Sequence, residues 1–283
     1  MSTTTKRVAL ITGGASGMGL AVATSLSNQG GWNIHILDLH AQRGQEAASA
    51  IHATFHESNV TDYASLRRIF ETVFEKEGRI DFVFANAGIA EHANFFAEEE
   101  EEGGPKGLDP IVDINLKAVI TTSYLALHYL RKTPGGDKSL VITASCGGLY
   151  PSYYSPIYTA TKHAVVGFTR SIAPYFYHKA QIRVNAICPG TVKTNLLTSA
   201  EWANFPEEYF TPIAKIAATV LMLVEGRDEE QEEGKGQGVL NGKAVEISGT
   251  KHYYREAVGF CDEAMEAVMG ATNIEVLEHA QEV

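Results

Sequence analysis

The sequence is poor in cysteine, in basic residues and in long apolar runs, and each shortage excludes a class of protein. Three cysteines occur among 283 residues, Cys146, Cys188 and Cys261, and they are too few and too widely spaced for a disulfide framework or a metal-ligand cluster. Their scarcity is typical of a reducing compartment. We therefore expect a cytoplasmic protein without a structural metal.

Basic residues are outnumbered by acidic ones, 23 against 34, which gives a net charge of -11. Binding to nucleic acid requires clustered lysine and arginine, so we expect no nucleic-acid partner. The acidity is concentrated in two runs, Glu98 to Glu102 and Glu225 to Glu233. We interpret the segments around them, 98–107 and 226–238, as solvated surface loops and not as a site.

No apolar run is long enough to cross a membrane. The segment from Val8 to Ile11 is too short for a span or a signal peptide, and the last residues match no peroxisomal or lipid-anchor signal. We therefore expect no membrane association. The overall composition, 45% hydrophobic and 20% charged, is that of a globular protein with a sizeable core.

Short apolar segments alternate with longer amphipathic ones along the chain. The predicted strands are Val8–Ile11, Ile34–Leu37, Phe82–Ala85, Leu140–Thr143, Ile182–Ile187 and Ala244–Ile247. The predicted helices are Gly17–Asn28, Ala41–His52, Tyr63–Glu77, Pro110–Arg131, Pro156–Tyr177 and Ile213–Val224. Such alternation indicates an α/β fold with a parallel sheet covered on both faces. No linker divides the chain, so we expect one domain over 1–283, with a core at about 6–250 and a helical tail from 251.

A glycine-rich turn follows the first predicted strand and opens a helix. It reads Thr12-Gly13-Gly14-Ala15-Ser16-Gly17-Met18-Gly19. Glycines let the backbone approach a pyrophosphate, and a helix N-terminus adds unpaired N–H groups with a partial positive charge. A plain tight turn has a similar composition, but the strand before it and the helix after it favour a dinucleotide site.

Asp38 ends the second predicted strand, 19 residues after Gly19. A carboxylate there accepts both ribose hydroxyls of adenosine and repels a 2'-phosphate, which predicts NAD as the cofactor. Alternatively, Asp38 caps the helix that follows His40. The nearest fixed positive charge that could receive a phosphate is Arg43.

Tyr158 and Lys162 stand one helical turn apart in the sequence Tyr-Thr-Ala-Thr-Lys, so a helix brings phenol and ammonium to one face. The cation favours the phenolate and is expected to lower the tyrosine pKa from its ordinary value of about 10. A surface helix with a solvated lysine would show the same spacing. With the nucleotide motif in the same chain, we predict that Tyr158 is a general acid or base.

On these motifs the chain resembles the short-chain dehydrogenase/reductase family, and within it the members similar to NAD-dependent 15-hydroxyprostaglandin dehydrogenase. The likeness runs from about Val8 to Gly249. The family's TGxxxGxG motif matches at Thr12, Gly13, Gly17 and Gly19, and its YxxxK pair at Tyr158 and Lys162. The resemblance implies a Rossmann-type, doubly wound fold with a seven-stranded parallel sheet and helices on both faces.

The resemblance also implies a set of site residues. Ser145, Tyr158, Lys162 and Asn115 are the expected catalytic residues, with Asn115 supporting a water-linked proton relay. The expected cofactor-binding residues are Gly13, Ser16, Gly17, Met18, Gly19, Asp38, Asn59, Val60, Asn86, Ala87, Gly88, Tyr158, Lys162, Pro189, Gly190, Val192 and Thr194. The family's Asp-Val pair, which contacts adenine, is replaced here by Asn59-Val60. The family's PGxVxT motif matches at residues 189–194 and orients the nicotinamide.

The expected reaction is hydride transfer between NAD and a secondary alcohol or ketone. Two aromatic segments flank the predicted site, 149–154 and 196–210, and favour a bulky apolar or aromatic substrate over simple core packing. The resemblance further implies a homodimer or homotetramer, with the long helices 110–131 and 156–177 as the usual interface. The alternatives are an NADP-dependent biosynthetic ketoreductase and a cofactor-binding regulator that has lost catalysis.

Overall fold

The computed structural model describes residues 5–98, 102, 104–229 and 239–274. Both segments interpreted as acidic surface loops, 98–107 and 226–238, lie partly outside these residues. No helix among the described residues is long and apolar enough to cross a membrane.

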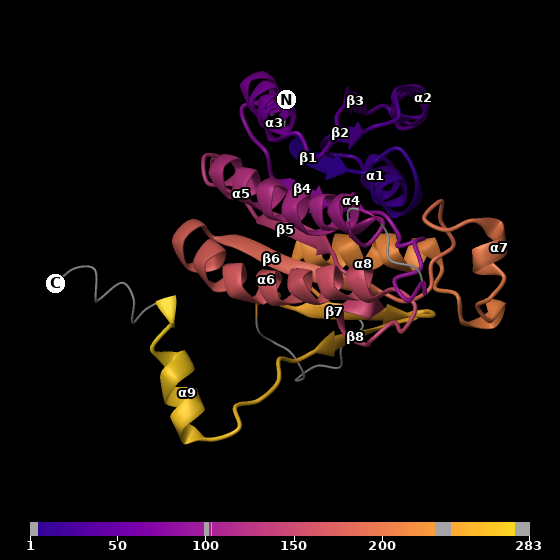
Figure 1. Ribbon diagram of the computed structural model, residues 1–283. Helices are drawn as coiled ribbons and strands as arrows, with labels where there is room; N and C mark the ends of the chain where they lie inside the picture. The colour runs from indigo at the N-terminus through magenta and orange to yellow at the C-terminus, as the bar shows by residue number, and fades with distance from the viewer. Residues whose placement is uncertain (1–4, 99–101, 103, 230–238, 275–283) are drawn as a thin grey trace.

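The predicted α/β architecture is confirmed, with a central sheet between two helical layers (Figure 1). Its strands are β1 Arg7–Thr12, β2 Trp32–Asp38, β3 Thr54–Glu57, β4 Phe82–Ala85, β5 Lys138–Thr143, β6 Ile182–Pro189, β7 Ala244–Ser248 and β8 Lys251–Arg255. They lie in the order β3-β2-β1-β4-β5-β6-β7-β8. The order reverses beside β1, because β2 and β4 pair on either side of it, and such a switch point is where α/β sheets bind ligands.

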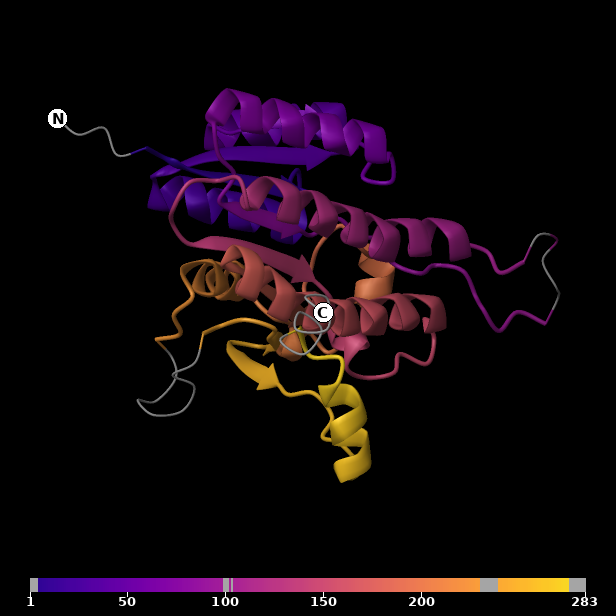
Figure 2. The same ribbon diagram turned by 90° about the vertical axis from the view of Figure 1, so that its left-hand side faces the viewer.

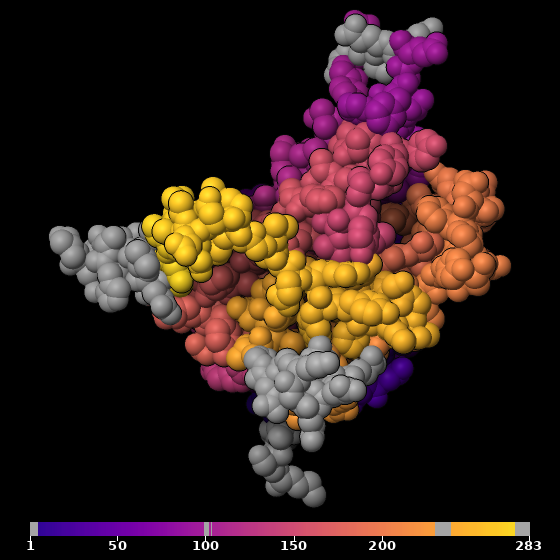
Figure 3. Space-filling model, turned by 90° about the horizontal axis from the view of Figure 1, so that it is seen from below, coloured from indigo at the N-terminus to yellow at the C-terminus, as the bar shows by residue number. Residues whose placement is uncertain are grey.

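The prediction of seven parallel strands was wrong by one strand. The first seven are parallel, but β8 pairs antiparallel with β7 and adds an eighth strand at the edge. Lys251–Arg255 was expected to begin a helical tail. Instead its exposure alternates along the strand, and the partly buried positions carry His252 and Tyr254. Polar-tipped side chains at these positions hide the alternation from a hydrophobicity pattern. Figure 3 shows β8, in yellow, across this face of the molecule.

Two layers of helices cover the sheet. α3 Tyr63–Glu77, α5 Ala118–Leu130 and α6 Pro156–Ala180 share one core with the sheet, built around buried side chains such as Phe70, Leu125 and Val165. α1 Gly17–Gln29, α2 Ala41–Ile51 and α8 Ile213–Glu225 form the other, with Val22, Ala48 and Val220 inside. The two layers lie on opposite sides of the strands in Figure 2. Each helix therefore buries one apolar stripe against the sheet.

The predicted helix from Pro110 to Arg131 is interrupted. α4 Leu108–Val112 passes into one turn of π-helix, Asp113–Lys117, before α5 begins. Asn115 lies within this turn and is completely buried. Such π-turns in α-helices often occur at functional sites, and no residue pattern in the sequence predicted this one.

Several shorter elements complete the chain. A 3-10 turn, Cys146–Gly148, follows β5, and α7 Ser199–Trp202 with a second 3-10 turn, Glu207–Tyr209, follows β6. The helix α9, Glu263–Gly270, stands away from the body in Figure 1, and all its residues are exposed. A helix is thus present in the tail region, although it begins later than predicted.

Candidate active site

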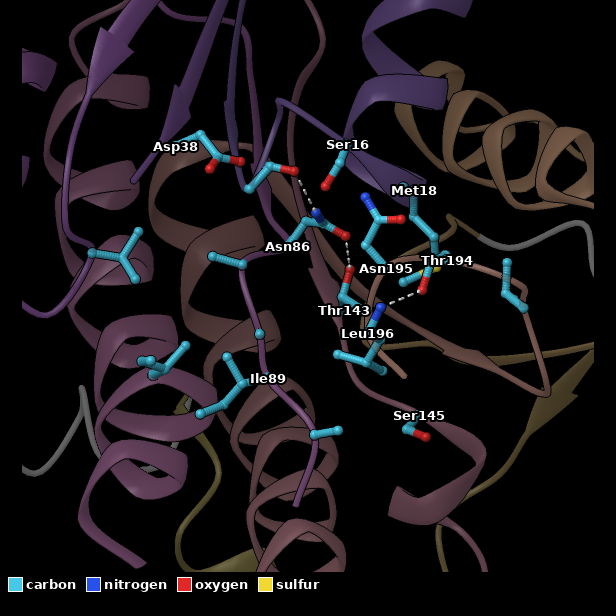
Figure 4. A pocket seen from close by; sticks show the side chains of 18 of the residues that line it. Ser16, Met18, Asp38, Asn86, Ile89, Thr143, Ser145, Thr194, Asn195 and Leu196 are labelled. Carbon is cyan, nitrogen blue, oxygen red and sulfur yellow. Dashed lines mark hydrogen bonds between the residues drawn. The ribbon is translucent and has the colours of Figure 1, made fainter. Parts of the chain in front are cut away.

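A cleft of about 490 Å³ opens at the carboxyl ends of the parallel strands. Figure 4 shows Asp38 at one end and Ser145 at the other, with Asn86 and Thr143 between them. The predicted site residues that line it are Gly13, Ser16, Gly17, Met18, Asp38, Asn59, Val60, Asn86, Ala87, Gly88, Ser145, Tyr158, Lys162, Pro189, Gly190, Val192 and Thr194. Two predicted residues, Gly19 and Asn115, lie outside the lining. Segments far apart in sequence therefore meet in one cavity, as the motifs predict.

The glycine turn is built for a close approach of its backbone. Gly13 has a φ of 64°, and a Cβ on it would lie 3.0 Å from the Cα of Ala87. A Cβ on Gly19 would lie 2.3 Å from the carbonyl oxygen of Gly13, so a glycine is needed here for α1 to pack against the turn. Gly17 and Met18, the first residues of α1, line the cleft, and the start of a helix at such a place suits a pyrophosphate.

Asp38 joins the end of β2 to the glycine turn. One carboxylate oxygen accepts a hydrogen bond from the Ala15 N–H at 3.1 Å, and the other accepts from the His40 N–H at 3.1 Å. Arg43 lies 3.6 Å from the same carboxylate. The alternative that Asp38 caps the helix after His40 does not hold, because His40 occupies the N-cap position of α2 and Asp38 accepts from the N–H of His40, which precedes the helix.

Asn59 lines the cleft after β3, next to Val60. Its Oδ1 accepts hydrogen bonds from both the N–H and the hydroxyl of Thr61, at 3.1 and 2.9 Å. The side-chain oxygen of Asn59, which stands where the family's adenine-contacting Asp does, is therefore already engaged within its own turn.

Asn86 ties three strands together beneath the cleft. Its Nδ2 donates to the carbonyl of Thr12 at 3.1 Å, and its Oδ1 accepts from the Thr143 hydroxyl at 3.0 Å. The Thr12 hydroxyl in turn accepts from the Asn86 N–H at 2.9 Å. Because Thr12 and Thr143 end β1 and β5 and Asn86 directly follows β4, the network fixes the floor of the cleft at the switch point.

Asn115 holds the backbone that follows Asn86. Its Oδ1 accepts from the Ile89 N–H and its Nδ2 donates to the Ile89 carbonyl, both at 2.9 Å. A Cβ on Gly88 would lie 3.2 Å from this Oδ1 and 3.7 Å from Lys162 Nζ. The π-turn thus brings Asn115 close to the lysine, and the predicted proton relay stays a prediction.

Ser145, Tyr158 and Lys162 converge at the inner end of the cleft. A Cβ on Gly147 would lie 3.4 Å from the Tyr158 ring and 3.5 Å from Ser145 Oγ, so the two hydroxyl-bearing side chains face one small space. Lys162 is buried and donates to the Thr143 carbonyl at 2.9 Å. Its Nζ lies 5.6 Å from the centre of the Tyr158 ring. Helical spacing has brought the pair together as predicted.

The prediction that the pKa of Tyr158 is lowered was wrong. Burial raises the pKa of Tyr158 to about 12, against an opposing hydrogen bond from Ser145. Burial also lowers the pKa of Lys162 to about 8. The ammonium donates to the Thr143 carbonyl and lies 5.6 Å from the ring centre, and the causes that set the Tyr158 pKa are burial, Ser145 and Cys146. Desolvation is the largest cause of the shift, and the sequence pattern does not reveal it.

The PGxVxT segment leaves β6 and forms one wall of the cleft. Thr194 Oγ1 accepts from the Leu196 N–H at 3.2 Å (Figure 4), and its carbonyl accepts from the Trp202 indole at 2.9 Å. His92, from the facing loop, lies 2.9 Å from Glu201 of α7. These contacts hold α7 beside the part of the cleft that Leu196 and Trp202 line.

The aromatic segments contribute less to the cleft than predicted. Of their large side chains, Leu196 and Trp202 line it, whereas Tyr153 and Tyr154 are 79% and 89% exposed and lie outside it. Tyr150 donates instead to Glu246 of β7.

The sequence reasoning missed several lining residues, among them Ile89, Ala90, His92, Ile114, Thr143 and Asn195. Their positions beside recognised motifs were the available signal.

Comparison with known proteins identifies the family. Residues 7–204 match the family described as short chain dehydrogenase. The chain is 47% identical over 279 residues to the short-chain dehydrogenase/reductase prx7 of Penicillium rubens, covering 91% of this chain and 97% of the relative. It is 34% identical over 204 residues to human 15-hydroxyprostaglandin dehydrogenase [NAD(+)], covering 69% and 71%.

Solved structures agree. A 3-ketoacyl-(acyl-carrier-protein) reductase from Brucella melitensis, in complex with NADH, superimposes with a TM-score of 0.71 at 25% identity, covering 86% of this chain and 97% of that one. A short chain dehydrogenase from Burkholderia cenocepacia, in complex with NADP, gives a TM-score of 0.69 at 25% identity, covering 86% and 96%. With its switch-point cleft, glycine turn and Tyr158–Lys162 pair, the chain belongs to the short-chain dehydrogenase/reductase family of nicotinamide-dependent oxidoreductases.

Proposed function

We propose that this protein is an NAD-dependent dehydrogenase that oxidises a secondary alcohol to a ketone, with Tyr158 as the general base. The observation that carries the proposal is one cleft with Asp38 at the nucleotide end and Ser145, Tyr158 and Lys162 at the other. In the reverse direction the same tyrosine acts as the general acid.

The described residues fit a dinucleotide. A Cβ on Gly13 would crowd Ala87, and Gly13 lines the cleft together with Gly17 and Met18, the first residues of α1. When bound, the nicotinamide ring accepts or supplies the hydride. Val192 and Thr194 would hold its carboxamide, and the buried ammonium of Lys162 would bind the hydroxyls of the adjoining ribose.

The protein's own groups move the proton. Tyr158 takes the proton from the substrate hydroxyl, and Ser145 donates a hydrogen bond to the same oxygen and stabilises the charge that develops there. Both side chains lie beside Gly147, which supports the proposal that they act on one substrate atom. Asn115 and Lys162 would carry the proton onward toward solvent.

NAD is favoured over NADP by the charge at the adenosine end. Asp38 presents a carboxylate there, and Arg43, the nearest guanidinium, lies 3.6 Å from it as an ion-pair partner. A 2'-phosphate would therefore meet a negative group whose cation is already engaged. The relatives include an NAD(+)-dependent enzyme, an NADH complex and an NADP complex.

Kinetics with both cofactors test this preference. We expect kcat/KM to be at least about tenfold higher with NAD than with NADP, and Asp38→Ala to narrow this ratio because the repulsion is removed and Arg43 is released. Arg43→Ala in the same background should restore discrimination against NADP. A wild-type enzyme that prefers NADP would favour the alternative function, a biosynthetic ketoreductase.

The substrate is proposed to be bulky and apolar or aromatic. Ile89, Ala90, Leu196 and Trp202 line the substrate end of the cleft, and such walls suit an apolar molecule with one reacting hydroxyl. A screen for NADH formation across steroid, prostanoid, polyketide-type and simple secondary alcohols would identify the class.

Tyr158→Phe tests the mechanism directly. We expect kcat to fall about 100-fold or more, because general acid–base catalysis is lost, while NAD affinity is retained. A near-normal kcat would contradict the assignment. Nucleotide binding without turnover in the wild type, with any alcohol of the screen, would favour the third candidate, a silent cofactor-binding regulator.

Self-association and a cytoplasmic location are further parts of the proposal. α5 and α6 are its proposed interface, and they carry the exposed apolar side chains Ile120, Tyr124 and Tyr175. Sedimentation would distinguish dimer from tetramer.

A further inference from the structure

Tyr158 lies in the first turn of α6, where helices are weakest. The helix begins at Pro156, so the amide of Tyr158 belongs to the group of N–H donors that no carbonyl of the helix can satisfy. Ser155 occupies the N-cap position, but its side chain makes no capping hydrogen bond. The turn that carries the proposed base therefore depends on an acceptor from elsewhere in the chain.

Glu91 supplies that acceptor. Its Oε2 accepts a hydrogen bond from the Tyr158 N–H at 2.8 Å, across 67 residues of sequence. The residue is buried, with 9% of its surface exposed, and its Oε1 has no hydrogen-bond partner among the described residues. A carboxylate suits a helix N-terminus because of the partial positive charge there, and a charged acceptor forms a stronger bond than a neutral one.

The loop that carries Glu91 is itself firmly held. Two residues earlier, both backbone polar groups of Ile89 are bonded to the Asn115 side chain at 2.9 Å. One residue later, His92 lies 2.9 Å from Glu201 of α7. The Glu91 carboxylate is thus presented to α6 by a fixed support.

Lys162 is anchored by a different device. It is buried and its Nζ donates to the Thr143 carbonyl at the end of β5. The two members of the pair share a helix, yet Lys162 is bonded to the sheet and Tyr158 to the loop after β4. Loss of one support should leave the other in place.

We propose that Glu91 is a positioning residue, which fixes the first turn of α6 and thereby holds the Tyr158 hydroxyl at the substrate oxygen. The inference rests on the proposed function of Tyr158. Glu91 is not a lining residue of the cleft and acts only through the backbone of Tyr158.

Steady-state kinetics of Glu91→Ala and Glu91→Gln test the proposal. Glu91→Ala should lower kcat about ten- to hundredfold, the effect expected for one hydrogen bond to a charged group, while the Kd for NADH stays within about twofold. Glu91→Gln should recover most of kcat, because the amide oxygen accepts the same N–H. Should Glu91→Ala fail to fold, Glu91→Asp, which draws the carboxylate back by one methylene, should lower kcat in the same selective way.

Asp62→Ala is the matched control. Asp62 accepts from the Ser65 N–H at 3.1 Å at the start of α3, which carries none of the proposed site residues. This variant should lose stability without a selective fall in kcat. A normal kcat in Glu91→Ala, or a parallel fall in kcat and NADH affinity in both Glu91→Ala and Asp62→Ala, would overturn the proposal.

Hydrogen exchange separates this inference from the proposed function. The Tyr158 amide should exchange about tenfold or more faster in Glu91→Ala than in the wild type or in Asp62→Ala. This result does not require turnover. If the wild type oxidises no alcohol, the proposed function fails while exchange still decides whether Glu91 holds the turn, and unchanged exchange would refute the role of Glu91.

Discussion

The pH dependence of turnover tests the protonation states that the structure gives to the catalytic pair. Burial raises the pKa of Tyr158 to about 12 and lowers that of Lys162 to about 8. At pH 7 about one Tyr158 side chain in 100,000 is then a phenolate, compared with about one in 1,000 at the ordinary pKa of 10. About nine in ten Lys162 side chains still carry their proton at that pH.

Oxidation and reduction should therefore respond to pH in opposite ways. Alcohol oxidation needs the phenolate and the ammonium, so its rate should rise about tenfold per pH unit up to about pH 8 and then level off as Lys162 loses its proton. Ketone reduction needs the phenol and the ammonium, so its rate should be constant below about pH 8 and fall about tenfold per unit above it. Initial rates with cofactor and substrate far below KM report these groups in the free enzyme.

Spectroscopy of the free protein checks the cause. Carbon-13 labelling of the tyrosine rings, with the Tyr158 signal assigned through Tyr158→Phe, gives its titration directly. Lys162→Ala should leave this titration nearly unchanged, because burial and not the ammonium sets the pKa. Ionisation of Tyr158 below about pH 9, or an oxidation rate already independent of pH near 7, would refute the reasoning.

Two further predictions concern the scaffold. Gly148→Ala should abolish activity and destabilise the protein, because its Cβ would lie 2.5 Å from the Lys162 carbonyl oxygen, whereas Gly167→Ala, with open space around it in α6, should stabilise by up to about 1 kcal/mol in urea unfolding. His56 stacks on the buried histidine of β2, and burial lowers its pKa to about 4. Between pH 6.5 and 4 the native state then binds fewer protons than the unfolded state, so stability falls on acidification, by about 2–3 kcal/mol from His56. His56→Gln should reduce this loss and the exposed His52→Asn should not; equal losses in both would contradict the assignment.

Most of the fold was accessible from the sequence because its strands are short apolar runs. Six runs, beginning at Val8 and ending at Ile247, coincide with strands, since a buried parallel strand must be apolar on both faces. β3 and β8 lie at the edges of the sheet, where one side stays open. Their side chains are mixed, so neither gave an apolar run.

Site residues could be predicted where the chemistry allows few residue types. They could not be predicted where their position depends on the folded backbone. Gly13, Asp38 and Tyr158 stand in patterns with few alternatives, and all three line the cleft. The π-turn around Asn115 and the bond from Glu91 to α6 depend on contacts between distant segments, and no local pattern encodes them. The prediction of a lowered Tyr158 pKa was wrong for the same reason, because burial is a property of the folded chain.

The edge strand β8 affects whether a strand from another molecule can pair with this sheet. Both sheet edges are short, four residues in β3 and five in β8, and the outer strand carries exposed Lys251 and Arg255. An incoming strand from another molecule would gain few hydrogen bonds and would have to accommodate two cations, which is how natural sheets resist edge-to-edge aggregation. Edge-to-edge pairing of two copies through β8 is therefore disfavoured.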